Sequence, residues 1–215
     1  MLTRILAGPA PVAWVAADEA YGQDAAFRAA CLHRNVGYVV AVPRSQQVPT
    51  RLGSRRIQTL AAAAPAEAWS RLSAGDGAKG PRLYDWASAR IGAWGDQDGG
   101  IGHWVLIRRS ITDPADLAFY LCAGPCDTPI EELVRVAGAR WAIEECFQAA
   151  KGNTGLDQYE VRSYPGWYRH ITLAMLAHAF LAVLAAQAAA KGEPLNKNTN
   201  THRSPWARSD GSWQL

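Results

Sequence analysis

The sequence lacks a strong excess of charge of either sign. Its 215 residues include 22 Lys and Arg against 19 Asp and Glu, which gives a formal net charge of +3. This balance allows nucleic-acid binding through a local basic patch but does not require it. Hydrophobic residues make up 49% of the chain and charged residues 19%, which is typical of a globular protein. The length is sufficient for one domain with a sizeable core.

Cysteine is also sparse. The chain has four cysteines, at positions 31, 122, 126 and 146. Only Cys122 and Cys126 are close in sequence, and no second Cys or His pair with zinc-like spacing follows them, so the pattern does not predict a zinc site. The N-terminal residues lack the features of a secretory signal. We therefore expect reduced cysteines and a cytoplasmic protein.

Long runs of Leu or Ile are absent. One stretch, residues 171–190, has the length of a membrane span, which is about 20 residues. It is rich in Ala, however, and contains His178 and Gln187. We therefore predict that this stretch is a helix buried within the domain and that the protein has no membrane partner.

The N-terminal part of the chain alternates between strand and helix patterns. An apolar strand at residues 11–17 ends at Asp18, and a second apolar strand spans residues 38–42. Asp24 is a suitable N-cap for the helix between them. A strand, a helix and a strand in this order indicate a βαβ unit, so we predict an α/β fold.

The middle of the chain contains a further helix and a strand pair. The Ala-rich residues 59–72 predict a helix, and residues 103–109 and 117–122 predict two paired strands. Thr128 then begins a capping-box pattern, which predicts the start of another helix. This helix either ends near Gly138 or continues, with a break there, into the next segment.

That next segment carries three charged side chains on one side of a helix. At about 100° per residue, Arg140, Glu144 and Lys151 lie within about 40° of each other, and Phe147 lies in the same sector. A Glu can bind Mg²⁺ through its oxygens, and flanking Arg and Lys side chains can hold phosphate oxygens. The pattern therefore suits a metal-and-phosphate site. The alternative is a helix with an ordinary salt bridge four residues apart.

Three segments carry a resemblance to a known family. They are residues 14–22 (WVAADEAYG), 140–151 (RWAIEECFQAAK) and 167–178 (WYRHITLAMLAH). Together they resemble the C-terminal part of a bacterial insertion-sequence transposase of the DDE superfamily, in the branch marked by a Tyr-x2-Arg-x3-Glu-x6-Lys signature. The second segment matches the spacing of the Arg, Glu and Lys, whereas Ala137 stands where the signature has Tyr.

The resemblance implies an RNase H-like catalytic core with a β-rich insertion and a C-terminal helix. Residues 1–43 would form a partial core that lacks the first strands, and residues 44–127 would form the insertion. Residues 128–191 would be the C-terminal helical part of the core. Residues 192–215 are polar and without periodicity, which predicts a disordered tail.

The resemblance also implies a set of site residues. Asp18 matches the second Asp of the catalytic triad and Glu144 matches the Glu, so both would be catalytic and bind Mg²⁺ or Mn²⁺. Arg140 and Lys151 match the residues that contact transposon-end DNA. Residues 1–17 contain no acidic side chain, so we expect the first catalytic Asp to be missing and the chain to be a truncated transposase.

Three functions remain open at this point. The parent activity is metal-dependent DNA strand cleavage and strand transfer, with insertion-sequence ends and target DNA as partners and a homodimer as the working form. Three carboxylates normally hold the two metal ions of such a site. The chain alone is therefore expected to be inactive, as a non-catalytic remnant or a repurposed DNA-binding fragment. The remaining alternative is an unrelated α/β module.

Overall fold

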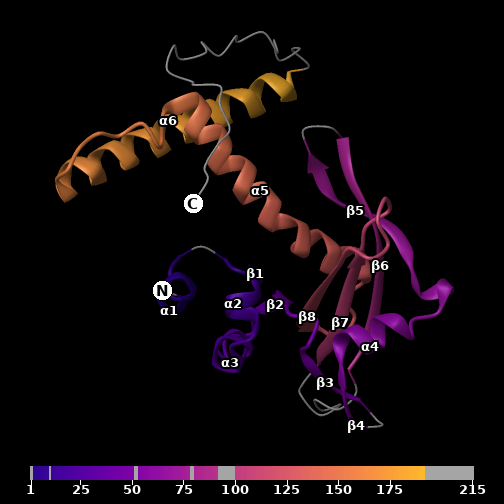
Figure 1. The fold of residues 1–215 in the computed structure, drawn as a ribbon. Coiled ribbons are helices and arrows are strands. Elements are labelled where there is room, and N and C mark those ends of the chain that lie inside the picture. Colours follow the sequence, from indigo (N-terminus) through magenta and orange to yellow (C-terminus); the bar gives the residue numbers. More distant parts are fainter. Residues whose placement is uncertain (1, 10, 51–52, 78–79, 92–99, 192–215) are drawn as a thin grey trace, which may run out of the picture. The chain divides into compact units, whose positions relative to one another are not determined.

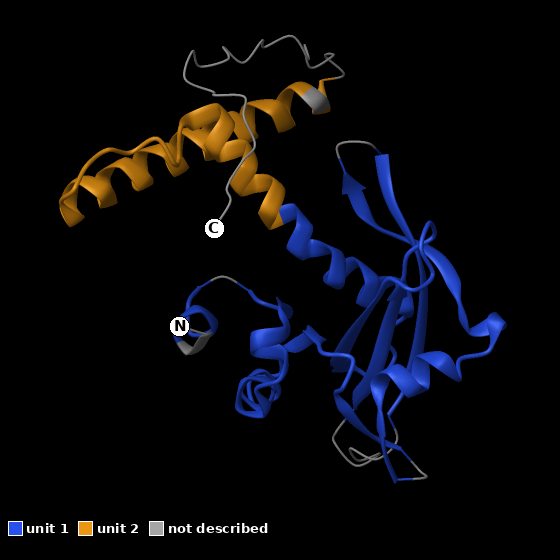
Figure 2. Ribbon diagram, in the orientation of Figure 1, with its two compact units in different colours: residues 1–142 blue, residues 143–215 orange. Residues whose placement is uncertain are grey.

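The computed structural model describes residues 2–9, 11–50, 53–77, 80–91 and 100–191. The chain forms two compact units, residues 1–142 and residues 143–215, and each is described by itself (Figure 2). The predicted disordered tail, residues 192–215, lies outside the described residues.

The helices and strands follow one another along the chain as labelled in Figure 1. In order they are α1 (Leu2–Leu6), β1 (Trp14–Ala17), α2 (Glu19–Gly22), α3 (Ala25–Leu32), β2 (Gly37–Val42), β3 (Gln47–Thr50), β4 (Gly53–Arg56), α4 (Ile57–Ala62), the 3-10 helix η1 (Ala66–Ala68), β5 (Ser70–Gly77), β6 (Gly80–Arg90), β7 (Ile101–Arg109), β8 (Leu117–Pro125), α5 (Ile130–Thr154) and α6 (Tyr164–Ala190).

A mixed six-stranded sheet forms the centre of the first unit. Its strand order is β1-β2-β8-β7-β6-β5, and β3 and β4 form a separate two-stranded sheet. The strands β1 and β2 are parallel, whereas the other neighbours in the large sheet are antiparallel. The chain is therefore a mixed α/β protein. The predicted strands at residues 103–109 and 117–122 are confirmed as the paired strands β7 and β8.

Side chains of the central strands alternate between two cores. On β7, Val105 and Ile107 enter one core, whereas Trp104 and Leu106 enter the other. The helices α3 and α4 cover the first face. The first half of α5 covers the second face with four buried apolar side chains. These are Leu133, Val134, Val136 and Ala137. The period-two alternation of the strands thus creates both layers.

The helix α5 continues without interruption through Gly138, so of the two alternatives the continuous helix is correct, and no break occurs. The glycine is buried against β5. A Cβ atom at this position would lie 1.8 Å from the carbonyl oxygen of Ala74. A hydrogen at Gly138 therefore allows the helix backbone to touch the strand backbone, which any other side chain would prevent.

The predicted helix at residues 59–72 is wrong over most of its length. The helix α4 ends at Ala62, Pro65 is the N-cap of the short η1 helix, and β5 begins at Ser70. Proline restricts the residue before it and cannot continue a helical hydrogen-bond ladder. Pairing of Ser70 with Trp86 on β6 then provides the backbone hydrogen bonds that a longer helix would have supplied.

The predicted burial of the last helix is also wrong. The helix α6 is present, but most of its large apolar side chains are exposed. Among the described residues of the second unit, α6 contributes Ile171 and Ala174 to a small core with Ala150 of α5 and Leu156. Within the described residues, one helix is long and apolar enough to cross a membrane, and it is this one, by length and composition only.

An ion-pair network joins the neighbouring strands β5, β6 and β7. Asp85 on β6 accepts hydrogen bonds from Arg71 on β5, at 3.0 Å, and from Arg109 on β7, at 3.3 Å. The guanidinium of Arg109 lies 4.0 Å from the ring centre of Trp69. The hydrogen bond from Arg71, followed by the one from Arg109, holds the pKa of the Asp85 carboxyl below its ordinary value.

The network predicts an acid-sensitive contribution to stability. Because the pKa of Asp85 is lower in the folded chain than in the unfolded chain, its contribution is fully present above the unfolded pKa. It is lost as the pH falls through the folded value. We expect Asp85→Asn to lower the urea midpoint at pH 7 and to flatten its decline in acid. Urea titrations from pH 7 to pH 3 test this, with the exposed Asp127→Asn as control. An Asp85→Asn curve parallel to wild type would contradict the prediction.

The two glycines of α5 give a matched pair of substitutions. Gly138→Ala places a methyl group against the Ala74 carbonyl and should destabilise the chain by about 1–3 kcal/mol. Gly152→Ala meets no atom within 4 Å and should stabilise it by up to about 1 kcal/mol, because Ala favours the helix. Urea denaturation measures both changes, and a Gly138→Ala variant as stable as Gly152→Ala would show that the close approach does not exist.

Candidate active site

Asp18 lies at the carboxyl end of β1, which is parallel to β2. It is the N-cap of α2, and its Oδ1 atom accepts hydrogen bonds from the backbone amides of Ala20, at 3.2 Å, and Tyr21, at 3.4 Å. The side chain is half-buried. The cap fixes the direction of the carboxylate and engages one of its two oxygens.

Direct contact between α2 and β2 holds this carboxylate in place. A Cβ atom on the buried Gly22 would lie 1.8 Å from the carbonyl oxygen of Ala41, so α2 lies directly on the strand. Arg28 donates a hydrogen bond to the Gly22 carbonyl and another to Tyr38. Burial raises the pKa of Tyr38 to about 12, so it remains a neutral phenol that can accept from the guanidinium. Arg28 could not be recognised from the sequence, because its role depends on tertiary contacts.

An open cavity of about 850 Å³ lies beyond the carboxyl end of β2. Its polar lining consists of Glu19, Arg44, Ser45 and Gln58. Ligands of α/β sheets commonly bind at the carboxyl ends of parallel strands, which is where this cavity lies. Glu19, the neighbour of Asp18, therefore borders an open space at the end of the parallel strand pair.

The charged residues of the signature lie along α5. Arg140, Glu144 and Lys151 are all exposed, and the unbroken helix provides the spacing that places them on one side. Arg140 belongs to the first unit with Asp18, whereas Glu144 and Lys151 belong to the second. The structure thus supports the common helical face but places Asp18 and Glu144 in separate units.

A cluster of arginines and aromatic rings lies beside Arg140 in the first unit. Tyr84 and Trp141 stack with ring centres 5.7 Å apart. The guanidinium of Arg108 lies 4.6 Å from the Tyr84 ring centre, and that of Arg82 lies 5.6 Å from the Trp141 ring centre. Arg108 also pairs with an acidic side chain at 3.7 Å. This cluster concentrates positive charge where α5 crosses the sheet, and its parts are too distant in sequence to be recognised from a motif.

Carboxylates such as those of Asp18 and Glu144 provide the oxygen ligands that Mg²⁺ and Mn²⁺ prefer. However, the described part of the chain contains no group of three or more His, Cys, Asp or Glu side chains that could hold a metal ion. The ligand type fits the expected metal, whereas the described residues do not bring three such ligands together.

The N-cap role of Asp18 can be separated from its charge. Asp18→Ala should cost about 1 kcal/mol of unfolding free energy, because the amides of Ala20 and Tyr21 lose their acceptor. Asp18→Asn keeps an acceptor oxygen and should cost only a few tenths of a kcal/mol. Urea denaturation distinguishes the two variants, and equal losses would show that the cap does not contribute to stability.

Comparison with known proteins does not identify a family. A scan against protein-family models and a search of the curated proteins both give no match to this chain. The resemblance to transposases therefore stays a prediction. The functional conclusion depends on the positions of the carboxylates and cations described above.

Proposed function

We propose that this chain derives from a DDE transposase with an RNase H-like core, and that its own activity is DNA binding. The observation that carries the proposal is the spacing of Arg140, Glu144 and Lys151 along one continuous helix, on which all three side chains are exposed. Asp18, at the carboxyl end of a parallel strand, supports the same assignment. In this proposal Asp18 and Glu144 are two of the three carboxylates of the parent's metal site.

DNA binding follows from the cations near this helix. Arg140 and Lys151 are exposed on the same side of α5, where they can contact phosphates of a DNA backbone. Arg82 and Arg108 add positive charge around Trp141, just beyond Arg140. The net charge of +3 is small, so a local concentration of arginine is what would attract DNA.

Strand cleavage is proposed for the parent protein and not for this chain alone. A divalent cation supplies such reactions with an activated nucleophile and a stabilised leaving oxygen, which requires ligands that fix its position. In this proposal Asp18 and Glu144 supply two of the three carboxylates that such a site normally has. The chain therefore acts as a DNA-binding remnant, located in the cytoplasm with the DNA it contacts.

Salt-dependent DNA binding tests the proposal. Each lost phosphate contact reduces the slope of log affinity against log salt by about 1. We expect Arg140→Ala and Lys151→Ala each to weaken binding to a labelled duplex and to reduce this slope, measured by fluorescence anisotropy. Arg162→Ala removes an exposed cation away from α5 and serves as the matched control. Equal affinity for all four proteins, or no binding by the wild type at low salt, would refute the proposal.

A cleavage assay separates binding from catalysis. We expect no nicking of supercoiled DNA by the wild-type chain in Mg²⁺ or Mn²⁺, and Glu144→Gln should bind DNA at least as tightly because it removes a negative charge beside two cations. Metal-dependent nicking that Glu144→Gln abolishes would show that the chain is a complete enzyme. Nicking that survives this substitution would show that Glu144 has no catalytic role.

A further inference from the structure

Polar groups without partners line the open cavity at the carboxyl end of β2, within the first unit. In the part of the chain that the structure describes, no ion pair or hydrogen bond engages the side chains of its polar lining, which are Glu19, Arg44, Ser45 and Gln58. Glu19 is the first residue of α2, and Arg44 follows β2 by two residues. Two opposite charges therefore line one cavity without pairing with each other, so that a ligand can pair with both.

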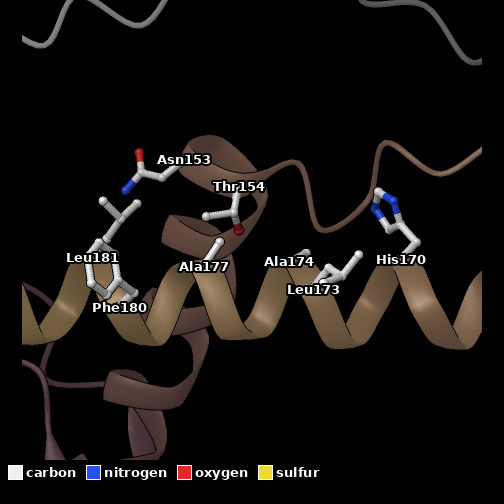
Figure 3. Close-up of a pocket in the computed structure, with 8 residues that line it drawn as sticks. All are labelled: Asn153, Thr154, His170, Leu173, Ala174, Ala177, Phe180 and Leu181. Carbon is white, nitrogen blue, oxygen red and sulfur yellow. The ribbon is translucent and has the colours of Figure 1, made fainter.

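The second unit contains a smaller cavity that differs in this respect. It has a volume of about 460 Å³ and is formed by the end of α5 and by α6 (Figure 3). Among the described residues that line it, none is Asp, Glu, Lys or Arg. The Thr154 hydroxyl donates a hydrogen bond to the Ala150 carbonyl, and the Nε2 atom of His170 lies 2.9 Å from the Gly155 carbonyl oxygen. Two of its polar side chains are thus engaged within the chain, and the cavity of the first unit is the better ligand site.

A strand edge also borders the cavity of the first unit. The pairing of β2 with β8 ends at Val42 and Phe119, and the next residue, Pro43, has no N–H to donate. The strand β8 begins two residues earlier, at Leu117, where its described partner is β7. Successive residues of a strand direct their N–H and C=O groups to opposite sides. One of Leu117 and Ala118, both of which line the cavity, therefore directs these groups away from β7, to the side on which β2 has ended.

The remaining lining suits small apolar groups. Val42 and Phe119 are buried and belong to the first core, so the sheet fixes this part of the lining. Pro43 and Leu117 add further apolar surface. The volume of about 850 Å³ lies within the range of about 300–1,000 Å³ that is usual for small-ligand sites. The cavity therefore suits a small ligand with apolar side chains and a charge at each end.

We propose that the cavity binds a short apolar peptide with free termini, which adds to the sheet beside β8. The peptide backbone pairs with the open edge of β8, as in other cases of strand addition. Its carboxylate binds the Arg44 guanidinium, and its ammonium group binds the Glu19 carboxylate. A DNA phosphate is disfavoured, because Glu19 places a like charge in the same cavity. A free amino acid has both charges but lacks the peptide bonds that pair with a strand.

The proposal is independent of the proposed DNA binding and is tested without DNA. Isothermal titration calorimetry of the wild-type chain should show binding of the tripeptide valyl-alanyl-valine. Acetylation of its amine and amidation of its carboxylate should each weaken binding at least about tenfold, as expected for the loss of a charge-assisted hydrogen bond. Free valine should also bind at least about tenfold more weakly. No binding of the tripeptide at millimolar concentration, or equal affinity for valine and the tripeptide, would overturn the proposal.

Matched variants assign the two charges. Arg44→Gln should weaken binding of the free tripeptide at least about tenfold and leave binding of the amidated form unchanged. Glu19→Gln should have the same effect on the free tripeptide and leave the acetylated form unchanged. Arg34→Gln removes an exposed cation that does not line the cavity and is the matched control. Equal losses for free and blocked peptides would overturn the assignment, because the two side chains would then not contact the termini.

Strand addition has its own test in the peptide. An extended tripeptide has two amide N–H groups, which point to opposite sides of its backbone, so only one of them can pair with β8. N-methylation of that amide should weaken binding at least about tenfold, whereas N-methylation of the other should have little effect. Calorimetry with the two methylated peptides measures the difference, and equal affinities would overturn the proposed addition to the sheet.

Discussion

The contact between Gly138 and the backbone of Ala74 is the constraint on which the first unit depends. It lets α5 lie against β5 with no side chain between the two backbones. On the same side of the helix, Leu133 and Val134 can then reach the core that contains Trp86. One turn beyond Gly138, Trp141 stacks on Tyr84. The first part of α5, up to Trp141, is therefore positioned by its contacts with β5 and β6.

A second constraint operates at the edge strand β1. The Trp14 indole lies over Gly37 of β2 and Gly124 of β8, where added Cβ atoms would approach within 2.6 and 2.3 Å of the ring. The indole also donates a hydrogen bond to Glu132 on α5. These contacts tie the short strand to the rest of the sheet and to α5. The carboxylate of Asp18, four residues later, takes its position from this attachment and from the N-cap of α2.

Much of this architecture could be predicted from local sequence. Asp24 caps α3 as expected, because an N-cap needs only an acceptor two or three residues before the amides. The strands β2, β7 and β8 follow from their apolar runs. Composition gave a wrong prediction where pairing with a distant strand determines the structure. The Ala-rich residues 59–72 were predicted to be one helix, but β5 begins at Ser70 and pairs with β6. The exposure of α6 could not be predicted either, because the apolar sequence of a helix does not tell whether other parts of the chain cover it.

The candidate site shows the same limit in its electrostatics. Motif spacing placed Arg140 and Glu144 on one helical face, but Arg28 and Arg108 act through contacts with residues distant in sequence. The proposed activity has two parts, DNA binding and metal binding, and they make different demands on the structure. Attraction of DNA needs only positive charge near the surface and tolerates changes in geometry. Metal binding needs oxygen atoms fixed in number and direction, and one oxygen of Asp18 is already engaged by the amides of α2. The proposed function therefore assigns DNA binding to this chain and does not require an intact metal site.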